Sequence, residues 1–346
     1  MESNLMYPAM LVTDSVNQRY FHHLNSGSGS GVMYVSQKRR VYISWLVRIK
    51  VELPEEVELL QVEQDTLGHV VKELLEEERI AYLTVEKTIP LVIYSLVSTE
   101  VEDIRIVSED GIARLREIKS AWELKQIQKA CEITDDAFKE VLNFVKPGIS
   151  ELEVAAFLEY QMRIRGSEEP NKTIVAAGKN SAYPHHWPTA YHIQTGDFVT
   201  MDFGCTVNGY HSDMTRTIVV GKPSERQKQI YHLVLTAQQA GIDALREGIQ
   251  GKEIDRIARN IIDSTEFEGS FLHGLGHGIG LNIHEGTGLG KEETRILRSG
   301  MVVSIEPGIY LEGNCGVRIE DIAVIHKNGA GLLEFSPKQL IALFNY

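Results

Sequence analysis

The sequence predicts a two-domain α/β (α+β) protein whose second domain is built from two similar halves. Three observations predict this architecture. The chain has 346 residues, whereas an ordinary single domain holds about 100–200 residues. Strand-like and helix-like segments alternate along its first third. In the remainder, several short motifs recur at a spacing of about 100 residues, as expected for an internal repeat.

The composition excludes several classes of function. Hydrophobic residues make up 43% of the chain and charged residues 24%, which is ordinary for a globular protein. Thirty-five basic residues against 48 acidic ones give a net charge of −13, whereas nucleic-acid binding needs a basic face. Apolar stretches fall short of the roughly 20 residues that span a bilayer, and the N-terminus does not resemble a signal peptide. Three cysteines cannot form a disulfide framework. We therefore expect a cytoplasmic protein with neither nucleic-acid nor membrane partners.

The first domain, residues 1–117, is predicted to combine a sheet with at least one helix. The helix covers Val70–Glu78, because four apolar residues there recur at helical spacing. Segments rich in β-branched and aromatic residues indicate strands. These predicted strands are Met10–Val12, Val32–Val35, Arg40–Ser44 and Ile80–Leu83.

The second domain, residues 118–346, is predicted to open on a long helix. Ser120 and Glu123 have the spacing of a capping box, in which each side chain binds the backbone amide of the other residue. Apolar residues then hold helical spacing through Leu142, until Pro147-Gly148 ends the helix. A second helix is expected to begin just after Ser150.

A repeat within the second domain predicts two half-domains related by a pseudo-two-fold axis. The segment Pro147–Glu153 has a counterpart in Glu247–Glu253, and Gly196–Gly204 aligns with Gly300–Gly308. Each aligned strand has a carboxylate six residues after its first glycine, and each is followed by a second strand that also bears a carboxylate. These carboxylates are Asp202 and Asp213 in the first half, and Glu306 and Glu320 in the second.

The first of these hairpins has a predictable register. Asn208-Gly209 between apolar runs predicts a two-residue type I′ turn, so paired residue numbers sum to 417. Asp202 and Asp213 then face the same side as diagonal neighbours, with Cα atoms about 7–8 Å apart. Buried carboxylates this close repel each other unless a cation or a shared proton compensates. If the second hairpin faces the first, two divalent ions would balance the four charges.

A histidine-rich segment supplies a nitrogen donor. Residues His273–Glu285 contain His273, His277 and His284, and the four glycines among them disfavour a helix. An extended backbone would place His273 and His277 on one face and allow close approach of the main chain. Nine of the twelve histidines lie after residue 180, in the same domain as the acidic hairpins.

These features, taken with three further motifs, resemble the pita-bread metallopeptidases, the family of creatinase, aminopeptidase P and prolidase. The further motifs are Pro184-His185-His186-x-Pro188, Glu306-Pro307-Gly308-x-Tyr310 and Arg318-x-Glu320-Asp321. The sequence is most similar to prolidase (Xaa-Pro dipeptidase) or a short aminopeptidase P. The resemblance implies a creatinase-like N-terminal α/β domain, a C-terminal pita-bread domain with an internal pseudo-two-fold repeat, and a homodimer.

The resemblance also implies a role for individual residues. His185 and His284 would contact the substrate, with His284 stabilising the oxyanion, and Glu306 would also move protons. His273 would line the pocket for proline, while Tyr310 and Arg318 would orient the substrate or support the site. The ligands of a two-metal centre would be Asp202, Asp213, His277, Glu306 and Glu320, with Asp213 and Glu320 bridging the ions.

Oxygen-rich ligation with one imidazole favours Mn²⁺, although Co²⁺ or Zn²⁺ could substitute. The expected reaction is hydrolysis of the Xaa-Pro bond in small peptides, by a hydroxide that two metal ions activate. We expect dipeptides as substrates, with Xaa-Pro aminopeptidase activity as the alternative. Methionine aminopeptidase, a creatine-hydrolysing relative and a non-enzymatic binding protein of the same fold are more distant alternatives. The last two would be expected to lack ligands that this sequence keeps.

Overall fold

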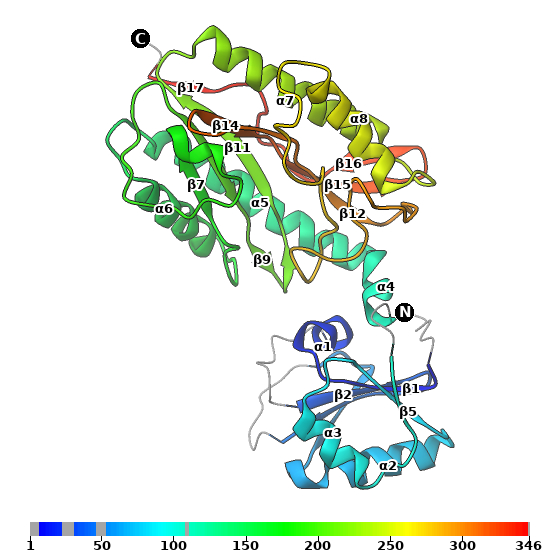
Figure 1. The fold of residues 1–346 in the computed structure, drawn as a ribbon. Coiled ribbons are helices and arrows are strands. Elements are labelled where there is room, and N and C mark those ends of the chain that lie inside the picture. The colour runs from blue at the N-terminus through cyan, green and yellow to red at the C-terminus, as the bar shows by residue number, and fades with distance from the viewer. Residues whose placement is uncertain (1–6, 23–30, 46–52, 108–110, 345–346) are drawn as a thin grey trace. The chain divides into compact units, whose positions relative to one another are not determined.

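The computed structural model describes residues 7–22, 31–45, 53–107 and 111–344, shown in Figure 1. The chain divides into two compact units, Met1–Arg116 and Glu117–Tyr346. Within the described residues, no helix has the length and apolar character needed to cross a membrane. All three cysteines are buried and free.

The first unit holds a six-stranded mixed sheet in the order β4-β3-β2-β1-β5-β6. Strands β1, β2 and β3 pair antiparallel, while β4, β5 and β6 add to the sheet in parallel. Its strands are β1 (Ala9–Val12), β2 (Gly31–Ser36), β3 (Arg40–Ser44), β4 (Val57–Gln61), β5 (Leu83–Val85) and β6 (Ile104–Ile106). The helices of this part of the chain are α1 (Ser15–His22), α2 (Leu67–Glu78), α3 (Leu91–Ser98) and α4 (Gly111–Glu117).

One predicted strand was displaced. The segment Ile80–Leu83 was expected to be extended, but β5 begins only at Leu83. Helix α2 ends on Arg79, whose φ of 59° is left-handed, and the amide of Ile80 then donates to the carbonyl oxygen of Leu75 at 2.8 Å. Because this helix-capping bond occupies the Ile80 amide, Ile80 belongs to the end of the helix and not to the strand ladder.

The second unit opens on two capped helices, as the sequence predicts. Helix α5 (Ala121–Phe144) and helix α6 (Glu151–Ile164) each begin with a complete capping box. In α5, the Ser120 amide donates to Glu123 Oε2 at 2.8 Å, and the Glu123 amide donates to Ser120 Oγ at 3.3 Å. These bonds satisfy amides that the first turn of a helix leaves without a partner.

The second unit consists of two similar halves. In each half, a pair of helices precedes and packs against antiparallel strands, and the strands lie between the two helix pairs in Figure 1. Each half has its own cluster of buried apolar residues. The first half adds β7 (Ile174–Ala177), β8 (Phe198–Phe203), β9 (Thr206–Val207), β10 (Tyr210–His211) and β11 (Met214–Val220). The second half contains α7 (Glu225–Ala244), α8 (Gly251–Asp263), β12 (Val302–Ile305), β13 (Gly308–Leu311), β14 (Cys315–Arg318), β15 (Asp321–His326) and β16 (Gly329–Leu332), and β17 (Ala342–Leu343) pairs with β11.

The predicted hairpin register is confirmed. Met214 pairs with Phe203 and Thr215 with Asp202, so the paired numbers sum to 417. Asn208 and Gly209 have φ values of 49° and 79°, the two positive values that a type I′ turn requires. Asp202 therefore lies on β8 and Asp213 directly before β11, close to each other on neighbouring strands.

Candidate metal centre and substrate cavity

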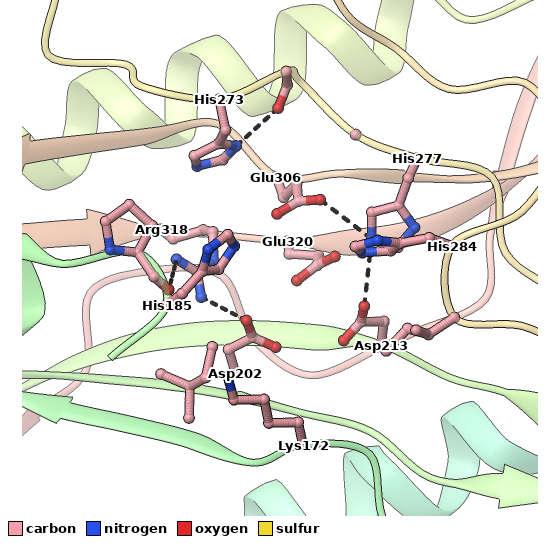
Figure 2. A pocket seen from close by; sticks show the side chains of 15 residues that line it. Lys172, His185, Asp202, Asp213, His273, His277, His284, Glu306, Arg318 and Glu320 are labelled. Atoms are coloured by element: carbon pink, nitrogen blue, oxygen red, sulfur yellow. Dashed lines mark hydrogen bonds and ion pairs between the residues drawn. The ribbon is translucent and has the colours of Figure 1, made fainter. Parts of the chain in front are cut away.

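A cavity of about 390 Å³ opens in the second unit, between its two halves. Nine of the ten site residues predicted from the sequence line it. These nine are His185, Asp202, Asp213, His273, His277, His284, Glu306, Arg318 and Glu320. Tyr310, the tenth, lies behind this lining and hydrogen-bonds to His273 and Arg318. Asp202 and Glu306, from different halves, thus face one common space (Figure 2).

The glycine-rich segment brings His277 to the carboxylates by close backbone approach. The Ser304 amide on β12 donates to the carbonyl oxygen of His277 at 2.8 Å, and the His277 amide donates to Ser304 Oγ at 3.0 Å. A Cβ atom on Gly276 would lie only 1.9 Å from the carbonyl oxygen of Ser304. Only glycine fits there, which explains why this segment is rich in glycine.

His277 presents one nitrogen to the carboxylates. Its Nε2 lies 3.5 Å from Asp213 Oδ2 and 3.4 Å from Glu306 Oε1, as the dashed lines in Figure 2 show. Its Nδ1 faces the carbonyl oxygen of Gly278 at 3.2 Å and donates to it, which leaves the lone pair on Nε2. This is the orientation that metal-bound histidines adopt. One ligand atom each from Asp213, His277 and Glu320 lies within 4.8 Å of the others.

The carboxylates that line the cavity are buried close together, and their burial and mutual repulsion disfavour the ionised forms. Burial, followed by the charges of Asp202 and Glu306, raises the pKa of Asp213 well above its usual value. Burial and the charge of Asp213 likewise raise the pKa of Glu320, and burial raises the pKa of Glu306. Glu320 Oε2 accepts from Thr215 Oγ1 at 2.7 Å, whereas its buried Oε1 has no hydrogen-bond partner. An unsatisfied, buried acceptor among mutually repelling carboxylates fits divalent cations.

Arg318 connects Asp202 to the part of the cavity wall that carries His273. Its Nη2 donates to Asp202 Oδ2 at 2.5 Å, and its Nη1 donates to the Tyr310 hydroxyl oxygen at 2.9 Å. The Tyr310 hydroxyl in turn donates to His273 Nε2 at 2.8 Å, because His273 Nδ1 already donates to the Gly274 carbonyl oxygen. Arg318, Tyr310 and His273 thus form one hydrogen-bonded chain that fixes this wall.

A comparison with known proteins gives the family. Residues 125–327 match the model of metallopeptidase family M24. The chain belongs to metallopeptidase family M24. Members of this family use divalent metal ions, in agreement with the donor set of the cavity.

Full-length relatives of this M24 peptidase include proline-specific enzymes. The chain is 37% identical to the Xaa-Pro dipeptidase of Pyrococcus horikoshii, over 96% of this chain and 94% of the relative. It matches the structure of an Xaa-Pro dipeptidase from Bacillus anthracis with a TM-score of 0.91 and 36% identity, covering 99% and 97% of the two chains. The structure of an X-Pro aminopeptidase from Thermotoga maritima matches with a TM-score of 0.89 and 31% identity, covering 97% and 98%. These matches confirm the predicted architecture, an N-terminal α/β domain and a C-terminal pita-bread domain.

The M24 site also depends on residues that the sequence did not single out. Glu151 is fully buried and accepts hydrogen bonds from the Ala177 amide at 2.8 Å and from the Thr189 amide at 3.0 Å. Its Oε2 also lies 2.9 Å from His186 Nε2, so this one carboxylate organises the loop that carries His185. In the sequence, Glu151 looks like an ordinary acidic residue in the first turn of a helix. Only its three-dimensional surroundings distinguish it.

The pKa of His273 predicts a pH-dependent stability in this M24 peptidase. Burial, followed by the charge of Arg318, lowers the pKa of His273 from 6.5 to about 4. The folded state therefore binds fewer protons than the unfolded state between these values, so stability falls as the pH drops from 6.5 towards 4. His273→Gln should show a shallower loss of unfolding free energy over this range. Urea denaturation of both metal-free proteins at several pH values measures the difference, and parallel pH profiles would contradict it.

Proposed function

We propose that this M24 peptidase hydrolyses the Xaa-Pro bond of dipeptides with two divalent ions, Mn²⁺ being the preferred metal and Co²⁺ or Zn²⁺ alternatives. The observation that carries the proposal is the meeting of four carboxylates and one imidazole at a single cavity, with Glu320 Oε1 buried and unpaired. The residues that would hold the ions are Asp202, Asp213, His277, Glu306 and Glu320, and Asp213 and Glu320 would be shared between the two ions.

The ions would supply an activated water and polarise the scissile carbonyl. The side chains of the cavity provide the other functions. Glu306 Oε1 accepts from Ser304 Oγ at 3.1 Å and faces the cavity, where it can take up a proton and pass it on. Burial and the nearby His277 lower the pKa of His284, so at neutral pH its neutral ring can donate an N–H bond to an oxyanion. His185 lines the opposite part of the cavity as a second substrate contact.

The preference for proline is proposed from the wall opposite the carboxylate cluster. An Xaa-Pro amide has no N–H, so its recognition relies on shape more than on a hydrogen bond from the scissile amide. His273, held by Tyr310 and Gly274, lines the cavity there, and its lowered pKa keeps the ring neutral at pH 7. The Xaa-Pro dipeptidases among the full-length relatives support this preference.

Xaa-Pro aminopeptidase activity is the second candidate, since a full-length structural relative is named an X-Pro aminopeptidase. A substrate panel separates the candidates. Purified protein is tested with Ala-Pro, Leu-Pro and Arg-Pro, with Arg-Pro-Pro tripeptides and with Met-Ala, after chelation and after addition of Mn²⁺. We expect metal-dependent hydrolysis with kcat/KM highest for the dipeptides. Preference for the tripeptide would favour the aminopeptidase, and faster cleavage of Met-Ala would contradict proline specificity.

The remaining expectations from the sequence are proposals of the same kind. We infer a homodimer that acts on small peptides in the cytoplasm, without a nucleic-acid or membrane partner. The acidic net charge of −13 supports the absence of a polyanionic partner.

A further inference from the structure

One lysine faces the cavity from the edge of its sheet. Lys172 stands two residues before Ile174, which begins β7 and pairs with Asp202 of β8. Side chains two residues apart along an extended segment point the same way, and both Lys172 and Ile174 line the cavity (Figure 2). Lys172 lies below Asp202 in that view, away from His273.

The ammonium group of Lys172 is held by an aromatic ring. Its Nζ lies 3.8 Å from the centroid of the Trp187 ring. Trp187 is 65% exposed, so packing in the protein core does not explain its place beside the cavity. A cation–π contact restrains the ammonium on one side and leaves its N–H donors available to another partner.

The other permanent cation of the cavity is already engaged. Arg318 uses four of its five donors on protein acceptors, namely Asp202, Thr215, Tyr310 and the carbonyl of Pro184. Within the part of the chain that the structure describes, no acceptor or carboxylate pairs with Lys172 Nζ. Lys172 is therefore the cation in this lining with donors free for a ligand.

We propose that Lys172, steadied by Trp187, recognises a carboxylate of the substrate and so selects which Xaa-Pro peptides this site takes. The inference rests on the proposed function. The carboxylate can come from the free C-terminus of a dipeptide or from an acidic side chain preceding proline. The positive charge of Lys172 at this point attracts an anionic group that enters the cavity.

The size of the effect follows from charged hydrogen bonds. Loss of one such bond typically changes affinity by about 10-fold or more. Because Lys172 is exposed, ionic strength screens the interaction, so added salt should reduce the selectivity. We expect Lys172→Met to lower kcat/KM for the recognised anionic substrate about 10-fold, mainly by raising KM. The value of kcat/KM for a neutral analogue should change much less.

The test compares matched substrate pairs in the Mn²⁺-loaded protein. Ala-Pro against Ala-Pro-amide reports on the C-terminal carboxylate, and Glu-Pro against Gln-Pro reports on an acidic side chain. The variants are Lys172→Met, Lys172→Arg to restore the charge, and Lys179→Met as a control. Lys179 carries the same charge nearby on the chain, is exposed and does not line the cavity.

The proposal is supported if Lys172→Met lowers the ratio of kcat/KM for an anionic substrate to that for its neutral partner, Lys172→Arg restores the ratio and Lys179→Met leaves it unchanged. The substrate pair whose ratio falls identifies the carboxylate that Lys172 recognises. Equal ratios in wild type and Lys172→Met would overturn it. If the wild type hydrolyses none of these peptides, the proposed function fails. Peptide binding, followed by tryptophan fluorescence, then tests separately whether Lys172 recognises a carboxylate. Tighter binding of Ala-Pro or Glu-Pro than of its neutral partner, lost in Lys172→Met, supports recognition by Lys172; equal binding overturns it.

Discussion

Asp213→Asn is expected to abolish nearly all hydrolysis of Xaa-Pro peptides and to lower the metal content below two ions per chain. Asp213 is buried, faces His277 Nε2 at 3.5 Å and lies in the donor group with Glu320. An amide of the same shape keeps the packing but loses the negative charge that the proposed two-ion site would require from Asp213. Elemental analysis of dialysed protein, together with kcat/KM, measures both effects.

Asp243→Asn on α7 is the matched control, because Asp243 is exposed and does not line the cavity. The stability of the metal-free protein gives a further check, because the same substitution should increase stability while it lowers activity and metal content. Burial, followed by the charges of Asp202 and Glu306, raises the pKa of Asp213, so the metal-free folded state loses stability as the pH rises above the ordinary pKa of an aspartate. Metal-free Asp213→Asn should therefore unfold at a higher urea concentration than metal-free wild type at pH 7. Full activity with two metal equivalents in Asp213→Asn would refute its assignment as a ligand.

His284→Ala is expected to reduce kcat by about 10²–10³-fold, the usual cost of losing one oxyanion donor, while metal content is kept. The His284 ring lies 4.0 Å from the His277 ring, centroid to centroid, at the lining of the cavity. Because His284 lies outside the buried apolar clusters of both halves, its removal leaves the hydrophobic cores unchanged. The thermal unfolding midpoint should therefore stay close to that of the wild type.

His232→Ala, at an exposed position on α7, provides the control for loss of an imidazole. Steady-state kinetics with saturating Mn²⁺ separate a fall in kcat from weaker metal binding. Turnover equal to that of the wild type would remove His284 from the mechanism. A fall in metal content parallel to the fall in activity would instead make it a residue that supports the metal centre.

Local chemistry made much of the second unit predictable. Asn208-Gly209 fixes a turn type and hence a register, so the neighbouring positions of Asp202 and Asp213 follow from the sequence alone. Ser120 with Glu123 fixes the start of α5 by bonds between residues three apart. In both cases the controlling interactions span only a few residues.

Features that depend on long-range contacts were not predictable in this way. The amide of Ile80 looked available for a strand, but the end of α2 uses it. Strands β4 and β6 were not predicted, since short edge strands have no strong alternation of their own. Glu151 and Lys172 are ordinary charged residues in the sequence. Their importance depends on Ala177, Thr189 and Trp187, which folding brings beside them.

Anomalous diffraction from crystals grown with Mn²⁺ tests the two-metal arrangement most directly. The proposed function predicts two anomalous peaks about 3.5–4 Å apart, the usual separation in binuclear sites. Both peaks should lie between the two halves of the second unit and be bound by oxygen atoms of the four carboxylates and by His277 Nε2. A single ion elsewhere, or Asp202 and Glu306 directed towards different sites, would contradict the binuclear centre.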